Sequence, residues 1–187
     1  MQVKIKNEKK VYDGFFKIIE AEIEHERFDG STQTIKRLCF ERGDAVAAVV
    51  FDPIAHELLF TEQFRYPVYG RSGDTTILEL VAGMVNPGEY TDDCLKREIK
   101  EEIGYGIKRH TYLGTYFLSP GGSSERIHLY YVVLGEKNGK GGGRLDESED
   151  IKVRRFGISD FRKLPKFNDA KTALGLALSR DLWLNGY

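Results

Sequence analysis

The sequence predicts an α+β fold in which helices flank a mixed β-sheet, an α/β/α sandwich. Three observations support this fold class: an alternating apolar and acidic pattern near the N-terminus, several apolar runs of strand length, and two amphipathic segments of helical period. The 187 residues, 41% of them hydrophobic, are enough for one globular domain with a small satellite. A chain of this length buries roughly 70% of its unfolded surface, so it needs no disulfides to stabilise its core.

The N-terminal segment is expected to form an antiparallel sheet. From Ile19 to Glu26, apolar or small residues alternate with acids, which is typical of a strand with one solvated face. Asp29-Gly30 supplies a turn, and residues 32–42 read as the returning strand. We therefore predict a β-meander over residues 1–43 and a main domain over residues 44–187. Because such a sheet is marginally stable alone, it should pack on the rest of the chain or on a second copy.

The main domain alternates apolar runs with two helical segments. Strands are predicted at residues 44–52, 56–64, 77–81, 111–118, 127–134 and 151–156, and helices at residues 92–103 and 169–183. In the first helix Leu95, Ile99 and Ile103 form one apolar stripe, Thr91 is a candidate N-cap and Gly104 a candidate stop. The glycine-rich segment 137–150 has the composition of a mobile loop.

Charge and composition narrow the class of ligand. Lys and Arg number 28 against 29 Asp and Glu, a net charge of −1, which argues against sequence-independent binding of nucleic acid. The longest apolar run is Ala45 to Phe51, and the first ten residues lack the apolar region of a signal peptide, so we expect neither a membrane span nor export. Two cysteines, Cys39 and Cys94, are too few for a disulfide framework or a thiolate metal site, which favours a cytoplasmic location.

The first helix carries an unusual concentration of acids. Glu98 and Glu102 lie one turn apart with Glu101 beside them, and like charges at this spacing cost a few tenths of a kcal/mol per pair. Carboxylate oxygens are the ligands that Mg²⁺ prefers, so these side chains are candidates for a metal site. The alternative is a solvated helix face, because Lys96, Arg97 and Lys100 are interleaved with the acids.

The residues around this helix match a known spacing. Gly83 is followed after five residues by Glu89, after seven more by Arg97-Glu98-Ile99, and then by Glu101-Glu102 and Gly104. This pattern resembles the Nudix box, the signature of hydrolases that cleave a nucleoside diphosphate linked to another moiety. The last aliphatic position of the box is Tyr105, a departure that hardly affects the chemistry. The resemblance implies a Nudix fold, with its mixed sheet between helices, after the N-terminal meander.

The resemblance also implies roles for individual residues. Glu98 and Glu102 match the principal metal ligands, Glu101 a further ligand or water-orienting group, and the carbonyl of Ala82 a backbone ligand. Arg97 matches a residue that pairs with Glu89 and holds the loop against the helix, work that suits a bidentate guanidinium. Mg²⁺ is the implied cofactor, with Mn²⁺ as the alternative.

Further segments are similar to the ADP-ribose pyrophosphatase branch of this family. Pro120 of Ser119-Pro-Gly-Gly122 follows Tyr105 by fifteen residues, although Ser-Pro-Gly-Gly out of context is an ordinary turn. The branch implies a substrate site with an adenine-stacking aromatic ring, cations near the diphosphate or ribose, and further contacts. The matching residues are Phe15 for the ring, Arg37 and Arg65 for the cations, and Met84 and Glu125 for the further contacts. The ordinary alternatives are a core phenylalanine and surface ion pairs.

The acidic segment 146–150 resembles the catalytic loop of the family, in which a glutamate activates the attacking water. Glu147 is our first choice for that base and Glu149 the second. An acidic surface loop is the competing interpretation. Glu101 and Glu102 complete the implied catalytic set, since they would hold the metal that acidifies the water.

These features predict Mg²⁺-dependent hydrolysis of ADP-ribose to AMP and ribose 5-phosphate. Another nucleoside diphosphate sugar, such as GDP-mannose, is the alternative within the family, because Lys140-Gly-Gly-Gly-Arg144 also resembles members acting on such substrates. A module that binds nucleotides without cleaving them is the alternative from another class, and the intact set of carboxylates argues against it. The resemblance further implies a homodimer paired through the meander.

Overall fold

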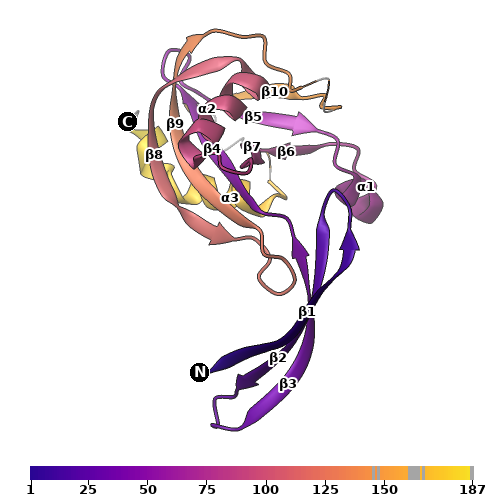
Figure 1. Cartoon of the computed structure of the whole chain (residues 1–187). Coiled ribbons are helices and arrows are strands. Elements are labelled where there is room, and N and C mark those ends of the chain that lie inside the picture. Colours follow the sequence, from indigo (N-terminus) through magenta and orange to yellow (C-terminus); the bar gives the residue numbers. More distant parts are fainter. Residues whose placement is uncertain (145, 147, 160–164, 166, 186–187) are drawn as a thin grey trace. The chain divides into compact units, whose positions relative to one another are not determined.

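The computed structural model describes residues 1–144, 146, 148–159, 165 and 167–185. The chain divides into two compact units (Figure 1). The first unit contains Met1–Asp44 and Phe117–Arg126, and the second contains Ala45–Tyr116 and Ile127–Tyr187. We describe each unit by itself.

The first unit is built on a three-stranded antiparallel sheet. Its strands are β1 (Val3–Asp13), β2 (Lys17–Glu26) and β3 (Thr32–Glu41), in the order β1-β2-β3. The segment 117–126 joins the end of β3, where the Phe40 N–H donates to the Gly122 carbonyl at 2.8 Å and the Ser124 N–H donates to the Phe40 carbonyl at 3.2 Å. Every residue of β1 is exposed, so this strand gains its order from pairing with β2 and not from burial.

The second unit is a seven-stranded sheet with helices. The central strand β4 (Asp44–Asp52) is buried from Ala45 onward, as its unbroken apolar sequence predicts. The main strand order is β10-β5-β4-β9-β8, with β6 paired to β5 and β7 paired to β4. The remaining elements are β5 (Glu57–Gln63), α1 (Tyr66–Ser72), β6 (Ile77–Glu79), β7 (Val81–Met84), α2 (Thr91–Glu98), η1 (Ile99–Ile103), β8 (Tyr105–Phe117), β9 (Arg126–Lys137), β10 (Lys152–Gly157), α3 (Ala170–Leu178) and α4 (Arg180–Leu184).

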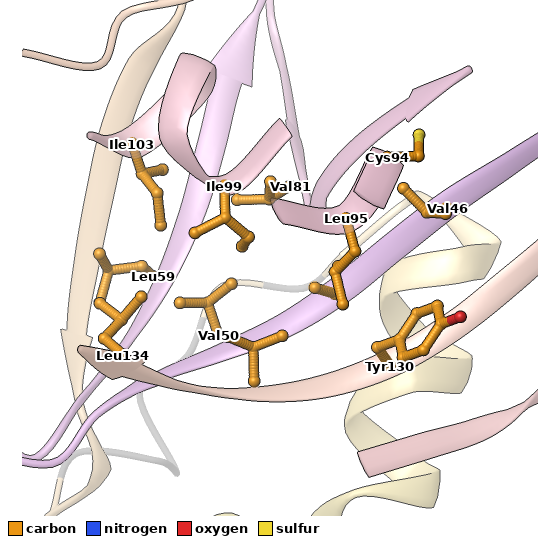
Figure 2. Packing of buried hydrophobic residues seen from close by; sticks show 12 residues of the cluster. Val46, Val50, Leu59, Val81, Cys94, Leu95, Ile99, Ile103, Tyr130 and Leu134 are labelled. Atoms are coloured by element: carbon orange, nitrogen blue, oxygen red, sulfur yellow. The ribbon is translucent and has the colours of Figure 1, made fainter. Parts of the chain in front are cut away.

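Helices pack on both faces of this sheet. On one face the predicted stripe of Leu95, Ile99 and Ile103 contacts the even-numbered side chains of β4, including Val50 (Figure 2). On the other face Gly175 of α3 lies so close to Val49 that an added Cβ would be 2.9 Å from Val49 Cγ2. Successive residues of a strand point to opposite faces, so α2 and α3 enclose β4 between them. None of the described helices is long and apolar enough to cross a membrane.

The first predicted helix has a more complex form than expected. It is α-helical only to Glu98 and continues as one π-helical turn over Ile99–Ile103. Tyr90, not Thr91, occupies the N-cap position. Gly104 ends the helix with φ of 79°, the left-handed conformation that glycine adopts without strain, as predicted. Isolated π-helical turns are often found at functional sites, and this one contains Glu101 and Glu102.

Three other elements differ from the sequence prediction. The strand expected over residues 77–81 is two short strands, β6 and β7, which pair with different neighbours. Helix α1 was not predicted, because its seven residues are too few for a clear helical period. The second helical segment is interrupted at Ser179, whose hydroxyl donates to the Gly175 carbonyl at 2.7 Å.

The packing of α2 predicts a stability effect. We expect Leu95→Ala to lower the free energy of unfolding by about 2–5 kcal/mol, because Leu95 is fully buried in the core cluster and the substitution leaves a cavity. Urea unfolding monitored by circular dichroism measures this change. Leu178→Ala in α3 is the control: Leu178 is exposed, and its substitution should cost less than about 1 kcal/mol. Equal losses in the two variants would contradict the packing described here.

Candidate active site

A bidentate ion pair fixes the loop before α2 to the helix. Arg97 donates from Nε and Nη2 to the two carboxylate oxygens of Glu89, both at 2.9 Å. Nη2 also donates to the Met84 carbonyl at 3.1 Å, and Glu89 accepts from the Asn86 N–H at 2.9 Å. The Arg97 guanidinium lowers the pKa of Glu89 to about 2. The structure thus contains the Glu89–Arg97 pair that the sequence resemblance implies.

The three glutamates of the helix differ in their surroundings. Glu102 is 2% exposed and Glu98 7%, whereas Glu101 is half-buried. Arg97 Nη1 donates to Glu98 Oε1 at 2.5 Å and to Glu101 Oε2 at 3.3 Å. Glu102 Oε2 accepts from the backbone N–H of Ala82 at 3.3 Å. Glu102 therefore lacks the guanidinium contact that Glu98 and Glu101 share.

Burial perturbs the ionisation of two of these acids. Burial raises the pKa of Glu98 to about 7, against the lowering effect of Arg97, and the charges of Glu101 and Glu149 add to the increase. The pKa of Glu102 lies well above its usual range, mainly because the side chain is buried and also because of the Glu98 charge. The cationic groups of the protein therefore do not fully compensate the negative charge of ionised Glu98 and Glu102.

The backbone is shaped around these carboxylates. A Cβ on Gly83 would lie 1.9 Å from Glu98 Oε1, so no other residue type fits at this position without displacing the carboxylate. Ala82 lies on β7, where the N–H and carbonyl of one residue project to the same side. Because its N–H faces Glu102, its carbonyl is directed to the same side as the acids.

The donors fit a hard divalent cation, although they are not preassembled around one. Within the residues described, no group of three or more His, Cys, Asp or Glu side chains is arranged as a ready-made metal site. Arg97 instead donates hydrogen bonds to Glu98 and Glu101. The available ligands are oxygen atoms of carboxylates and of one backbone carbonyl, the type that Mg²⁺ and Mn²⁺ prefer. A cation would compete with Arg97 for two of them.

Part of the glycine-rich segment, whose composition predicts a mobile loop, is hydrogen-bonded to the helix. The Gly142 N–H donates to the Glu102 carbonyl at 2.8 Å, and the Gly143 N–H donates to the Glu101 carbonyl at 3.1 Å. Gly141 has φ of 70°, and an added Cβ would lie 2.7 Å from the backbone carbon of Ile103. Composition predicted flexibility here, but these glycines serve close backbone approach.

This anchoring brings Glu149 near the acids of the helix. Glu149 Oε2 accepts from the Arg144 N–H at 2.9 Å, and its charge raises the pKa of both Glu98 and Glu102. Asp146 pairs with Arg144 at 2.5 Å. Glu147, our first choice for the base, lies outside the described residues. The structure places Glu149, our second choice for the base, within electrostatic reach of the helix.

Arg65 also lies within reach of the acidic cluster. It follows β5. Burial raises the pKa of Glu102, and the positive charge of Arg65 partly offsets this increase. Its Nε donates to Oε2 of Glu79, a buried residue at the end of β6, at 2.8 Å. Glu79 was not among the site residues predicted from the sequence. The available signal was one acid inside the otherwise apolar run Ile77–Val81.

The other expected substrate residues lie in both units. Met84, in the second unit, is partly exposed, and its carbonyl accepts from Arg97. Phe15 is 87% exposed and stacks edge-on against Phe16, so it is not the core residue of the alternative interpretation. Arg37 is exposed and donates to the Lys36 carbonyl, and Glu125 lies 3.5 Å from Arg42. Phe15, Arg37 and Glu125 all belong to the first unit.

Pockets in the described part of the second unit include the following two. One, of about 560 Å³, lies between α1 and the segment around Phe167 and includes none of the box carboxylates. The other, of about 500 Å³, is lined by Lys96, Arg97, Lys100, Glu101 and Gly139. The second pocket therefore includes Arg97 and Glu101 of the box, and we place the candidate chemistry beside it despite its smaller volume.

Comparison with known proteins agrees with this geometry. A family model described as the NUDIX domain matches residues 41–174. The chain belongs to the NUDIX domain family. Over its full length it matches a solved structure described as an ADP compounds hydrolase, with a TM-score of 0.74, 23% identity and 96% of that chain covered. This likeness confirms the predicted Nudix fold with its mixed sheet.

The sequence relatives support the predicted branch. The NUDIX chain is 37% identical over 145 residues to an ADP-ribose pyrophosphatase of Escherichia coli (strain K12), covering 76% of this chain and 69% of the relative. It is 35% identical over 158 residues to an ADP-ribose pyrophosphatase of Haemophilus influenzae, covering 81% and 72%. A GDP-mannose pyrophosphatase of Pectobacterium atrosepticum is 28% identical over 162 residues, covering 84% and 82%. The resemblance inferred from the box and from Pro120 is thus confirmed.

The Arg97 network predicts a pH-dependent change in stability. The folded pKa of Glu89, about 2, lies below the usual value of 4.5 for a glutamate, so this pair stabilises the fold above pH 4.5 and the contribution is lost between about pH 4.5 and 2. We expect metal-free Arg97→Met to be about 1–3 kcal/mol less stable than the native chain at pH 6. The difference should shrink at pH 3. Urea unfolding in EDTA at both pH values measures it, and a difference independent of pH would contradict the assignment.

Proposed function

We propose that this NUDIX protein hydrolyses the pyrophosphate bond of ADP-ribose with Mg²⁺, giving AMP and ribose 5-phosphate. The observation that carries the proposal is the burial of Glu98 and Glu102 with incomplete charge compensation, in a box whose other polar residues hold the loop in place. The ADP-ribose pyrophosphatases at 35% and 37% identity support the choice of substrate.

Pyrophosphate hydrolysis requires charge neutralisation and an in-line water but little covalent chemistry from the protein. Glu98, Glu101, Glu102 and the Ala82 carbonyl would hold the metal. When bound, it supplies compensation for the diphosphate charge and lowers the pKa of the attacking water. Mn²⁺ has the same preference for oxygen ligands and is the alternative metal.

The remaining residues bind the substrate and handle the proton. Arg65 presents its guanidinium to the diphosphate, and Glu149 accepts a proton as the water oxygen bonds to phosphorus and the bridging oxygen leaves. Glu147 stays the other candidate for this base. Phe15, Arg37, Met84 and Glu125 are the proposed contacts to the adenosine and ribose parts. We assign them these roles from the resemblance.

We further propose a homodimer in the cytoplasm. The exposed strand β1 includes apolar side chains, among them Val3 and Ile5, which pairing with a second copy would cover. Cys39 and Cys94 are both free, in keeping with a reducing compartment. The proposed domain boundary remains after residue 43, with the meander as the pairing element.

A second candidate substrate is GDP-mannose. The relative named a GDP-mannose pyrophosphatase, at 28% identity, and the Lys140–Arg144 segment favour it. A panel of nucleoside diphosphate sugars incubated with Mg²⁺, with released nucleotides separated by chromatography, decides between the two. Release of AMP from ADP-ribose at the highest kcat/KM supports our proposal, and preferential release of GMP from GDP-mannose contradicts it. Tight binding of ADP-ribose without product would instead favour a sensing module.

The carboxylate cluster predicts a specific loss of turnover. We expect Glu102→Gln to lower kcat by about 100-fold or more and to weaken Mg²⁺ binding at least tenfold, because it replaces a ligand by a neutral amide. Steady-state hydrolysis of ADP-ribose and calorimetric titration with Mg²⁺ measure the two effects. Glu136→Gln is the matched control, because Glu136 is an exposed glutamate of the same unit. Full activity in Glu102→Gln would remove the metal assignment.

The two candidate bases can be separated. We expect Glu149→Gln to lower kcat by about 100-fold or more while KM changes less than about twofold, because a general base acts in the chemical step. Glu147→Gln should then retain most of the activity. Parallel measurement of kcat and KM for both variants tests this. The reverse pattern would assign the base to Glu147.

A further inference from the structure

We infer that Glu79 is a positioning residue that orients the Arg65 guanidinium towards the bound diphosphate, with Lys171 of α3 fixing the carboxylate in turn. This inference rests on the proposed function, because it assumes that Arg65 contacts the substrate. Glu79 is 6% exposed, and its two oxygens have different cationic partners. Oε2 accepts from Arg65 Nε at 2.8 Å, and Oε1 accepts from Lys171 Nζ at 2.5 Å.

Glu79 is ionised in spite of its burial. Burial by itself raises the pKa of a carboxyl group, but the charges and hydrogen bonds of Lys171 and Arg65 outweigh it and lower the pKa of Glu79. A buried carboxylate between two cations makes stronger hydrogen bonds than a neutral acceptor. It therefore restrains the orientation of Arg65 more firmly than a surface ion pair would.

The hydrogen bond to Glu79 uses Nε of Arg65 and leaves its two Nη groups available. Its side chain is 42% exposed, and the Nε contact to Glu79 is the one side-chain hydrogen bond that it makes among the described residues. The Arg65 carbonyl accepts from the N–H groups of Val68 and Tyr69 at 3.0 Å, which fixes the backbone at the start of α1. With the backbone and Nε both held, the two Nη groups remain as a planar pair suited to phosphate oxygens.

The second attachment reaches Glu79 from a distant part of the sequence. Lys171 also lies 3.1 Å from Asp169 Oδ2, and Asp169 caps α3 by accepting from the Thr172 N–H at 3.0 Å. The Thr172 hydroxyl oxygen accepts from the Leu80 N–H, next to Glu79, at 3.0 Å. The beginning of α3 thus makes one hydrogen bond to Glu79 and one to Leu80. A carboxylate fixed at both oxygens cannot rotate away from Arg65.

A double-mutant cycle separates positioning from a merely structural role. We expect Glu79→Gln to raise KM for ADP-ribose about tenfold in the native background and less than about twofold in an Arg65→Ala background. Lys171→Met should raise KM in the same direction by about threefold, because one oxygen of Glu79 loses its partner. Steady-state kinetics with saturating Mg²⁺ measures all of these variants. An equal increase of KM in both backgrounds would overturn the inference.

Glu62→Gln is the matched control. Glu62 also belongs to the β5–β6 pair, and its Oε2 accepts a hydrogen bond from Arg154 Nη1 at 3.1 Å. Its cross-strand partner, however, is Leu78 and not Glu79. Neighbouring strand positions face opposite sides of a sheet, so Glu62 and Glu79 lie on opposite faces. We therefore expect native KM in Glu62→Gln. A tenfold increase there would show that any lost ion pair of this region affects KM, which would also overturn the inference.

A spectroscopic measurement tests the inference even if a variant folds too poorly for kinetics or the protein lacks the proposed activity. In ¹H–¹⁵N spectra the Arg65 Nε–H signal, assigned by its loss in Arg65→Lys, should exchange slowly with water in the native protein and rapidly in Glu79→Asp and Lys171→Met. Rapid exchange in the native protein would overturn the inference. Native KM in Arg65→Ala would refute the proposed role of Arg65 and the inference with it. Raised KM in Arg65→Ala with native KM in Glu79→Gln would overturn the inference alone.

Discussion

The structure of the second unit is organised around two buried carboxyl groups at the junction of α2 and η1. Glu98 and Glu102 are nearly inaccessible to water, and burial raises the pKa of both. A chain selected for stability alone would not retain them, because replacing buried ionisable groups by apolar ones of similar volume often stabilises a protein. The surrounding elements are best understood as the means of keeping these acids in place.

The packing and the glycines serve this arrangement together. Leu95, Ile99 and Ile103 attach one side of the helix to β4, which turns the acids towards β7 and the 141–143 segment. At Gly83 and Gly141 a side chain would collide with the Glu98 carboxylate or the Ile103 backbone. The glycines thus allow polar backbone and carboxylates to approach more closely than other residues would.

Local features were predictable from the sequence, and contacts between distant segments were not. The buried strand β4 and the helix with its Gly104 stop follow from patterns that span fewer than about 15 residues, and the Glu89–Arg97 pair follows from the resemblance to the Nudix box. The ion pair of Glu79 with Lys171 joins residues 92 positions apart, and no periodicity encodes such a contact. Composition also could not indicate that Gly141, Gly142 and Gly143 lie against the helix, because glycine favours both flexibility and close packing. The approach of Arg65 to Glu102 was likewise invisible in the sequence.

Arg97 shows how one side chain can hold the loop and still leave the acids free to act. Its Nε and Nη2 atoms bind Glu89, whereas Nη1 alone contacts Glu98 and Glu101. The two sets of bonds are separate, so Glu98 and Glu101 can exchange the guanidinium for another cation without loss of the Glu89 pair. A lysine could not divide its contacts in this way, because its single ammonium lacks the planar fork of donors. The position therefore requires arginine for its geometry as well as for its charge.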